Sequence, residues 1–117
     1  MSSSTDSQDS QAQSHALIQS IGARARSSNQ RRVGELTDVL ARICRGELTG
    51  AEREHAVDIA HQLVGSAGTF GYRRASALAR EVELFLRQVS KSDPEQVGAA
   101  LRALALVEQD LSADPES

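Results

Sequence analysis

Three observations predict an all-α protein built as an antiparallel four-helix bundle with an additional short N-terminal helix. Apolar residues recur at intervals of three and four through most of the chain, which is the spacing of one helix face. Proline, the strongest helix breaker, does not occur in the chain before Pro94. The core formers are mainly Ala, Leu, Val and Ile without an alternating β-branched run, and 117 residues suffice for one modest core.

The composition excludes several classes of function. A net charge of −3 argues against attraction of the whole domain to nucleic acid or to an anionic membrane. No run of apolar residues is long enough to span a membrane, and no apolar signal segment follows the start of the chain. The single cysteine, Cys44, cannot form an internal disulfide and is expected to be half-buried in the core. We therefore expect a soluble cytoplasmic protein.

The first 46 residues allow two interpretations. Residues 1–14 are almost entirely Ser, Thr, Asp and Gln, which predicts a flexible polar tail. Apolar positions in residues 15–26 predict a short helix, and Ser27-Ser28-Asn29 is a plausible interruption before a helix that ends at Gly46. Because the apolar positions stay nearly in phase across residues 27–29, one long helix is the alternative.

Three further helices have clearer limits. Thr49 and Glu52 form a capping-box pattern that begins the next helix. A strongly amphipathic pattern follows Gly71 and is expected to end near Ser90. Asp93-Pro94 is a start signal for the last helix, which extends to about Leu111. The predicted organisation is thus a tail at 1–14, a helical bundle at 15–112 and a disordered tail at 113–117.

His61 and the glycines that follow it are the most unusual feature of the chain. On a helical wheel His61 points away from the apolar stripe of Ala56, Ile59, Leu63 and Ala67 and faces solvent. Gly65 and Gly68, which carry no side chain, lie one and two turns further on, at a cost to helix stability. This pattern favours a histidine left open to a bulky partner, with Gln62 beside it. The alternative is an ordinary exposed histidine whose glycines serve helix packing or a C-cap.

A docking surface around His61 is also predicted from the wheel. Val57 and Val64 would give a partner a small apolar surface, while Arg73 and Arg74 would add cationic contacts. A metal site is not expected, because neither His15 nor His55 shares a helix face with His61. Hydrolase and nucleotide-binding patterns are absent as well.

The run AHQLVGSAGTFGYRRASALAREVE, residues 60–83, resembles the histidine-containing phosphotransfer (HPt) domain family. The resemblance implies that His61 is the phosphoacceptor, and that Gly65 and Gly68 leave room for the phosphoryl group and for a receiver domain. It implies a phosphocarrier without catalytic activity of its own and without a cofactor, because Mg²⁺ would be held by the receiver. The implied partners are response-regulator receiver domains or a hybrid histidine kinase, and we expect a monomer.

One position departs from the family pattern. Val64 stands where many members have a lysine, so a cation that would help to neutralise phosphohistidine is missing. Gln62, Arg73 or Arg74 are candidates to replace it in part. The alternative function is a phosphorylation-independent adaptor that binds a receiver or kinase through the same helical face.

Overall fold

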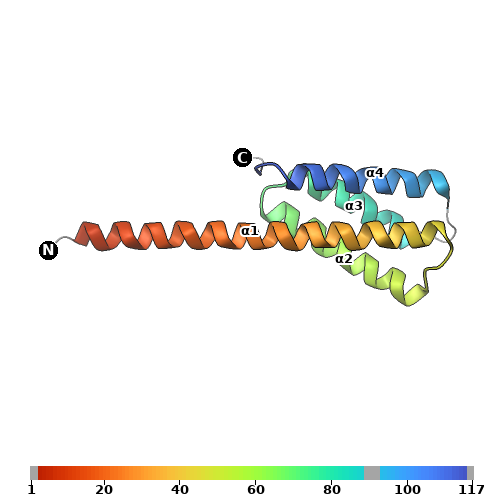
Figure 1. Ribbon diagram of the computed structural model, residues 1–117, viewed down its shortest axis with the longest axis horizontal. Helices are drawn as coiled ribbons and strands as arrows, with labels where there is room; N and C mark the ends of the chain where they lie inside the picture. Colours follow the sequence, from red (N-terminus) through yellow and green to blue (C-terminus); the bar gives the residue numbers. More distant parts are fainter. Residues whose placement is uncertain (1–2, 89–92, 116–117) are drawn as a thin grey trace.

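The computed structural model describes residues 3–88 and 93–115, with side chains from Ser10 onward. Four helices follow one another: α1 (Ser3–Cys44), α2 (Gly50–Thr69), α3 (Arg73–Gln88) and α4 (Pro94–Leu111). Each packs beside the next, and α4 packs against α1, which closes an up-and-down bundle (Figure 1). The predicted all-α antiparallel bundle is confirmed.

The prediction of a separate short N-terminal helix was wrong. α1 runs without a break through Ser27-Ser28-Asn29, because no proline interrupts it and Asn29 is buried against α2 rather than turned into a loop. Residues 3–14, which we expected to form a tail, belong to the same helix. Once a helix is nucleated, each further residue adds one backbone hydrogen bond, so polar residues extend it.

The hydrophobic core lies between the four helices, and a wide arc of the surface of α2 is buried in it. This arc includes Val57, which is only 7% exposed. Each helix of a four-helix bundle packs against two neighbours, so its buried face is broader than the stripe that one neighbour would require. The buried residues of the core are Val33, Leu36, Leu40, Ile43, Ala56, Val57, Ile59, Ala60, Leu63, Ala67, Tyr72, Ala75, Ala79, Val82, Leu86, Val97, Ala100, Ala103, Leu104, Val107 and Leu111.

A tight turn at Gly71 sets the register between α2 and α3. Gly71 has φ of 89°, a conformation that side chains with a Cβ rarely adopt. The Tyr72 N–H donates to the carbonyl of Ala67 at 2.8 Å, which turns the chain back along α2. Residues that stand equally far along the chain from Tyr72 therefore lie side by side, as Gly68 and Ser76 do.

Other limits of the helices follow the local signals. Asp93 caps α4 by accepting from the Glu95 N–H at 3.0 Å, with Pro94 as the first helical residue. The predicted end of the third segment near Ser90 lies outside the described residues. Cys44 is exposed rather than half-buried, because it is the last residue of α1 and borders the turn at Gly46.

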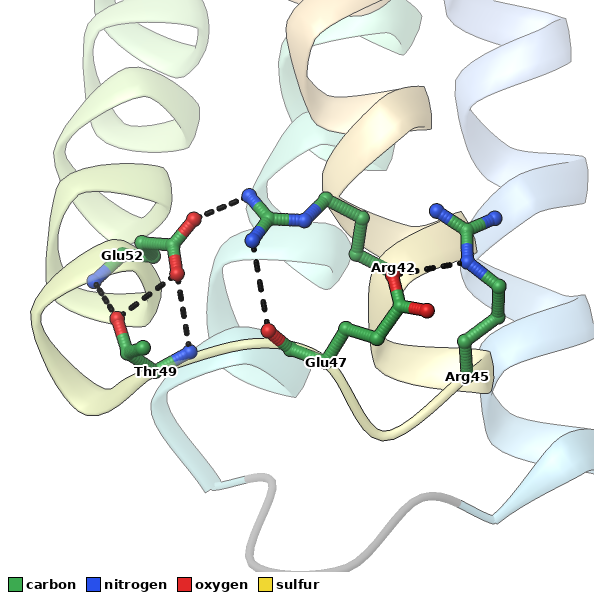
Figure 2. A network of polar contacts seen from close by, with 5 residues as sticks. All are labelled: Arg42, Arg45, Glu47, Thr49 and Glu52. Carbon is green, nitrogen blue, oxygen red and sulfur yellow. Dashed lines mark hydrogen bonds and ion pairs between the residues drawn. The ribbon is translucent and has the colours of Figure 1, made fainter.

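A network of polar contacts joins the end of α1 to the start of α2 (Figure 2). The Thr49 hydroxyl accepts from the Glu52 N–H at 3.2 Å and the Glu52 carboxylate accepts from the Thr49 N–H, which is the predicted capping box. Arg42 donates to the same carboxylate. Hydrogen bonds from Arg42 and then from Thr49 lower the pKa of Glu52 to about 2.

We expect Glu52→Gln to lower the midpoint of thermal unfolding at neutral pH and to lose this effect in acid. A folded-state pKa below the ordinary 4.5 means that the ionised carboxylate adds stability above that value, and that the addition is lost as pH falls toward about 2. Thermal unfolding followed by circular dichroism across this pH range measures the difference in stability between the variant and wild type. Glu54→Gln, an exposed site on the same helix, should parallel wild type. A Glu52→Gln curve parallel to wild type throughout would contradict the prediction.

Candidate functional site

His61 lies on the outer surface of α2, on the side that faces α3. Its side chain is 72% exposed, as the helical wheel predicted. The imidazole Nδ1 lies 3.2 Å from Oε2 of Glu83 on α3. His61 and Glu83 stand equally far along the chain from Tyr72, so the turn at Gly71 brings them together. The site is therefore built from two helices whose register is set by one glycine turn.

Glu83 is a buried carboxylate held by two side chains. Its side chain is 10% exposed, and its Oε2 accepts from Arg87 Nη2 at 2.8 Å and Arg87 Nε at 3.1 Å as well as from His61. Burial raises the pKa of Glu83, but hydrogen bonds from Arg87 and His61 and the attraction of their charges outweigh burial, so the pKa lies below 4.5. Glu83 is thus ionised at neutral pH.

An ionised Glu83 determines the tautomer of the neutral His61 ring. A carboxylate only accepts hydrogen bonds, so Nδ1 must carry the proton that it donates to Oε2. The other ring nitrogen, Nε2, then keeps its lone pair. In this arrangement His61 is an exposed nucleophile whose ring is oriented from behind by a buried anion.

The two glycines near His61 differ in their surroundings. A Cβ added to Gly65 would meet nothing within 4 Å, whereas one added to Gly68 would lie 3.3 Å from Oγ of Ser76. Ser76 donates to the carbonyl of Val64 at 2.8 Å, so α2 and α3 approach closely there. Packing accounts for Gly68, but it does not account for Gly65, which leaves open space beside the histidine.

We expect Gly65→Ala to stabilise the fold by about 0.5–1 kcal/mol, because alanine is the better helix former and its methyl group meets no neighbour. Gly68→Ala should gain less or lose stability, since Ser76 must move. Urea unfolding of both variants measures the difference. A destabilised Gly65→Ala would show instead that the fold itself requires glycine at this position.

The predicted docking residues are not all on the surface beside His61. Val57 cannot contact a partner as expected, since it is buried against the core for the reason given above. Val64 is half-buried and packs on the core. Arg74 lies 3.7 Å from Asp110 of α4, and Arg73 is exposed near the turn, so neither forms a described contact with His61. Among the described residues, Arg87 is the cation placed at this site, through its ion pair with Glu83.

Gln62 is exposed, but it lies on the α1 side of α2. There it borders a shallow groove of about 370 Å³, which is lined also by Arg31, Arg32, Glu35, His55, Asp58 and Ile59. On the wheel Gln62 follows His61 by 100°, which turns it from the α3 side toward the α1 side. A partner seated on His61 would reach Gln62 only at the edge of its contact.

Glu83 and Arg87 were not predicted from the sequence as members of the site. A signal was present: on the wheel Glu83 falls beside the buried Ala79, Val82 and Leu86. A carboxylate within an apolar arc, followed by arginine one turn later, indicates a paired buried charge.

Comparisons with known proteins identify the family of this chain. The family model described as Hpt domain matches residues 26–113, about three quarters of the chain. The chain belongs to the Hpt domain family. Hpt domains are phosphocarriers of two-component systems, whose partners are receivers and histidine kinases, and this sets the functional class. No solved structure matches the chain significantly.

One curated relative of this Hpt domain is Protein RcaC from Microchaete diplosiphon. It is 24% identical over 103 residues, which cover 88% of this chain and 16% of that protein. The chain thus spans about one sixth of the relative that it matches.

Among the helices described for this Hpt domain, none has the length and apolar character of a membrane span. Within the same ranges, His, Cys, Asp and Glu form no group of three that could hold a metal ion.

Proposed function

We propose that this Hpt domain carries a phosphoryl group on His61 between aspartates of receiver domains, or from a histidine kinase to a receiver. The observation that supports this most directly is the exposed His61 ring. Glu83 engages its Nδ1, and its Nε2 has no hydrogen-bond partner among the described residues. Family membership supplies the class of reaction. We further propose that the protein acts in the cytoplasm.

In the proposed reaction Nε2 of His61 attacks the phosphorus of a receiver's aspartyl phosphate. The N–P bond forms as the P–O bond to the aspartate breaks, and the carboxylate leaves with the electron pair. The ring gains positive charge while Nδ1 keeps its proton, and Glu83 stabilises that charge at 3.2 Å. Transfer to a second receiver is the reverse of these steps, and Mg²⁺ is expected among the receiver's acidic residues.

Gly65 and Arg87 have distinct roles in this proposal. Gly65, which has open space where a side chain would be, admits the receiver and the phosphoryl group. Gly68 keeps α2 close to α3, so its contribution to access is smaller. Arg87 holds Glu83 ionised and, with its side chain 52% exposed, supplies the positive charge that Val64 does not.

Labelling of the purified chain tests the proposal. Incubated with a receiver that carries ³²P on its aspartate, the wild type should gain label that is lost in acid and retained in alkali, as a phosphoramidate is. Mass spectrometry should place the added group on the peptide that contains His61. A wild-type chain that binds the receiver but acquires no such label would refute phosphoryl transfer.

The adaptor remains the second candidate, because Val64 stands where a lysine is common in the family. An adaptor would use the same face of α2 but would not need a nucleophile. Gly65→Arg should abolish receiver binding under both functions, since the long side chain fills the open space beside His61. The two functions differ in what they require of His61 itself.

A further inference from the structure

The N-terminal part of α1 projects beyond the bundle (Figure 1). Its side chains expose an apolar surface to solvent. In the described part of the chain, Arg26 is the first α1 residue that hydrogen-bonds to another helix or turn, through Tyr72. Before it, Leu17, Ile18 and Ile21 are 62%, 66% and 45% exposed. They are three of the four large hydrophobic residues exposed within the described ranges; the other is Leu84 on α3.

This apolar surface continues the face of α1 that packs on the bundle. Ile18 lies five full turns before the buried Leu36, so the two share one side of the helix. Ser10 to Ala25 by itself is too short and too rich in Ser and Gln to be a stable helix in water. A helical segment with this surface gains stability when another apolar surface covers it.

We propose that residues 10–25 pair with the same segment of a second copy of this chain, in antiparallel orientation. Charge distribution favours this occupant. Ser10 to Arg32 contains four arginines and no Asp or Glu, whereas Asp6 and Asp9 precede it. With the two-fold axis between Leu17 and Ile18, Asp9 of one copy is level with Arg26 of the other. A parallel pair would place like charges level with one another.

The size of the contact makes the dimer weak. A 16-residue segment is about 24 Å long, so two of them bury less than the roughly 1,200 Å² of a standard interface. We expect a dissociation constant on the order of 10–100 μM. The dimer replaces our expectation of a monomer and leaves His61 open, because that side chain lies on α2 within the bundle.

Sedimentation of the full chain over a range of concentrations tests the pairing. Wild type should shift from monomer to dimer as concentration rises, and Ile18→Glu should weaken the dimer at least about tenfold. Leu84→Glu, at an exposed hydrophobic residue of α3 that is 46% exposed, is the control and should dimerise like wild type. A wild type that stays monomeric at millimolar concentration, or a dimer lost in Leu84→Glu but not in Ile18→Glu, would overturn the proposal.

Disulfide trapping tests the orientation. In a Cys44→Ser background, Ile18→Cys lies near the two-fold axis and should form a disulfide-linked dimer under mild oxidation. Ala25→Cys should not, because an antiparallel pair separates its two copies by roughly 22 Å along the axis. Both variants would cross-link in a parallel pair, so an Ala25→Cys dimer would overturn the antiparallel arrangement.

Discussion

His61→Gln is expected to abolish phosphorylation of this Hpt domain completely while leaving its fold intact. Glutamine is similar in reach, but its amide nitrogen is not nucleophilic, so no N–P bond can form. The side chain is 72% exposed, and its replacement removes little packing. Transfer of ³²P from a phosphorylated receiver, with circular dichroism as the check on folding, measures the effect.

His55→Gln is the matched control for this experiment. His55 is exposed on the same helix but lies at the groove between α1 and α2, so its replacement should leave labelling unchanged. Label that persists in His61→Gln at the wild-type level would mean that another residue accepts the phosphoryl group. Loss in both variants would point to a general effect on α2 and would contradict the assignment to His61.

The same variant separates the phosphocarrier from the adaptor. In either function His61→Gln should still bind the receiver, because the open space at Gly65 is retained. Only a phosphocarrier should lose signalling in the cell when the nucleophile is removed. If His61→Gln signals as well as wild type while Gly65→Arg does not, the adaptor is the correct function.

Glu83→Gln is expected to slow phosphoryl transfer by about 10- to 100-fold. The neutral amide accepts a weaker hydrogen bond from His61 and loses the ion pair with Arg87. A hydrogen bond to a charged group contributes about 1.5–3 kcal/mol, which corresponds to this range in rate if the bond strengthens as the ring becomes positive. Single-turnover transfer from the receiver measures the rate separately from binding.

A positioning role for Glu83 predicts more than a slower rate. Nitrogen NMR of the imidazole should show Nδ1–H as the dominant neutral tautomer in wild type and a mixture in Glu83→Gln. Glu81→Gln on the exposed side of α3 should change neither the tautomer nor the rate. A Glu83→Gln variant with wild-type transfer kinetics would show that the ring needs no partner at Nδ1.

Local signals were sufficient for most helix limits. The capping box at Thr49 and Glu52 and the cap at Asp93 act within one turn of the chain, so their effect does not depend on the rest of the fold. The prediction of a break near Asn29 was wrong because a polar residue at this position is compatible with two structures. Its side chain either caps a loop or hydrogen-bonds to a buried partner, and here the Asn29 amide donates to the Ser66 hydroxyl of α2 at 3.1 Å.

The sequence by itself determined that His61 is exposed and that Gly65 leaves space beside it, because both follow from the period of a single helix. Only the tertiary structure decided that Val57 is buried and that Glu83 lies behind the imidazole. Those two facts depend on how α3 packs against α2, whereas a helical wheel describes the faces of one helix and not the position of the next. The turn at Gly71 makes that connection by setting which residues of the two helices meet.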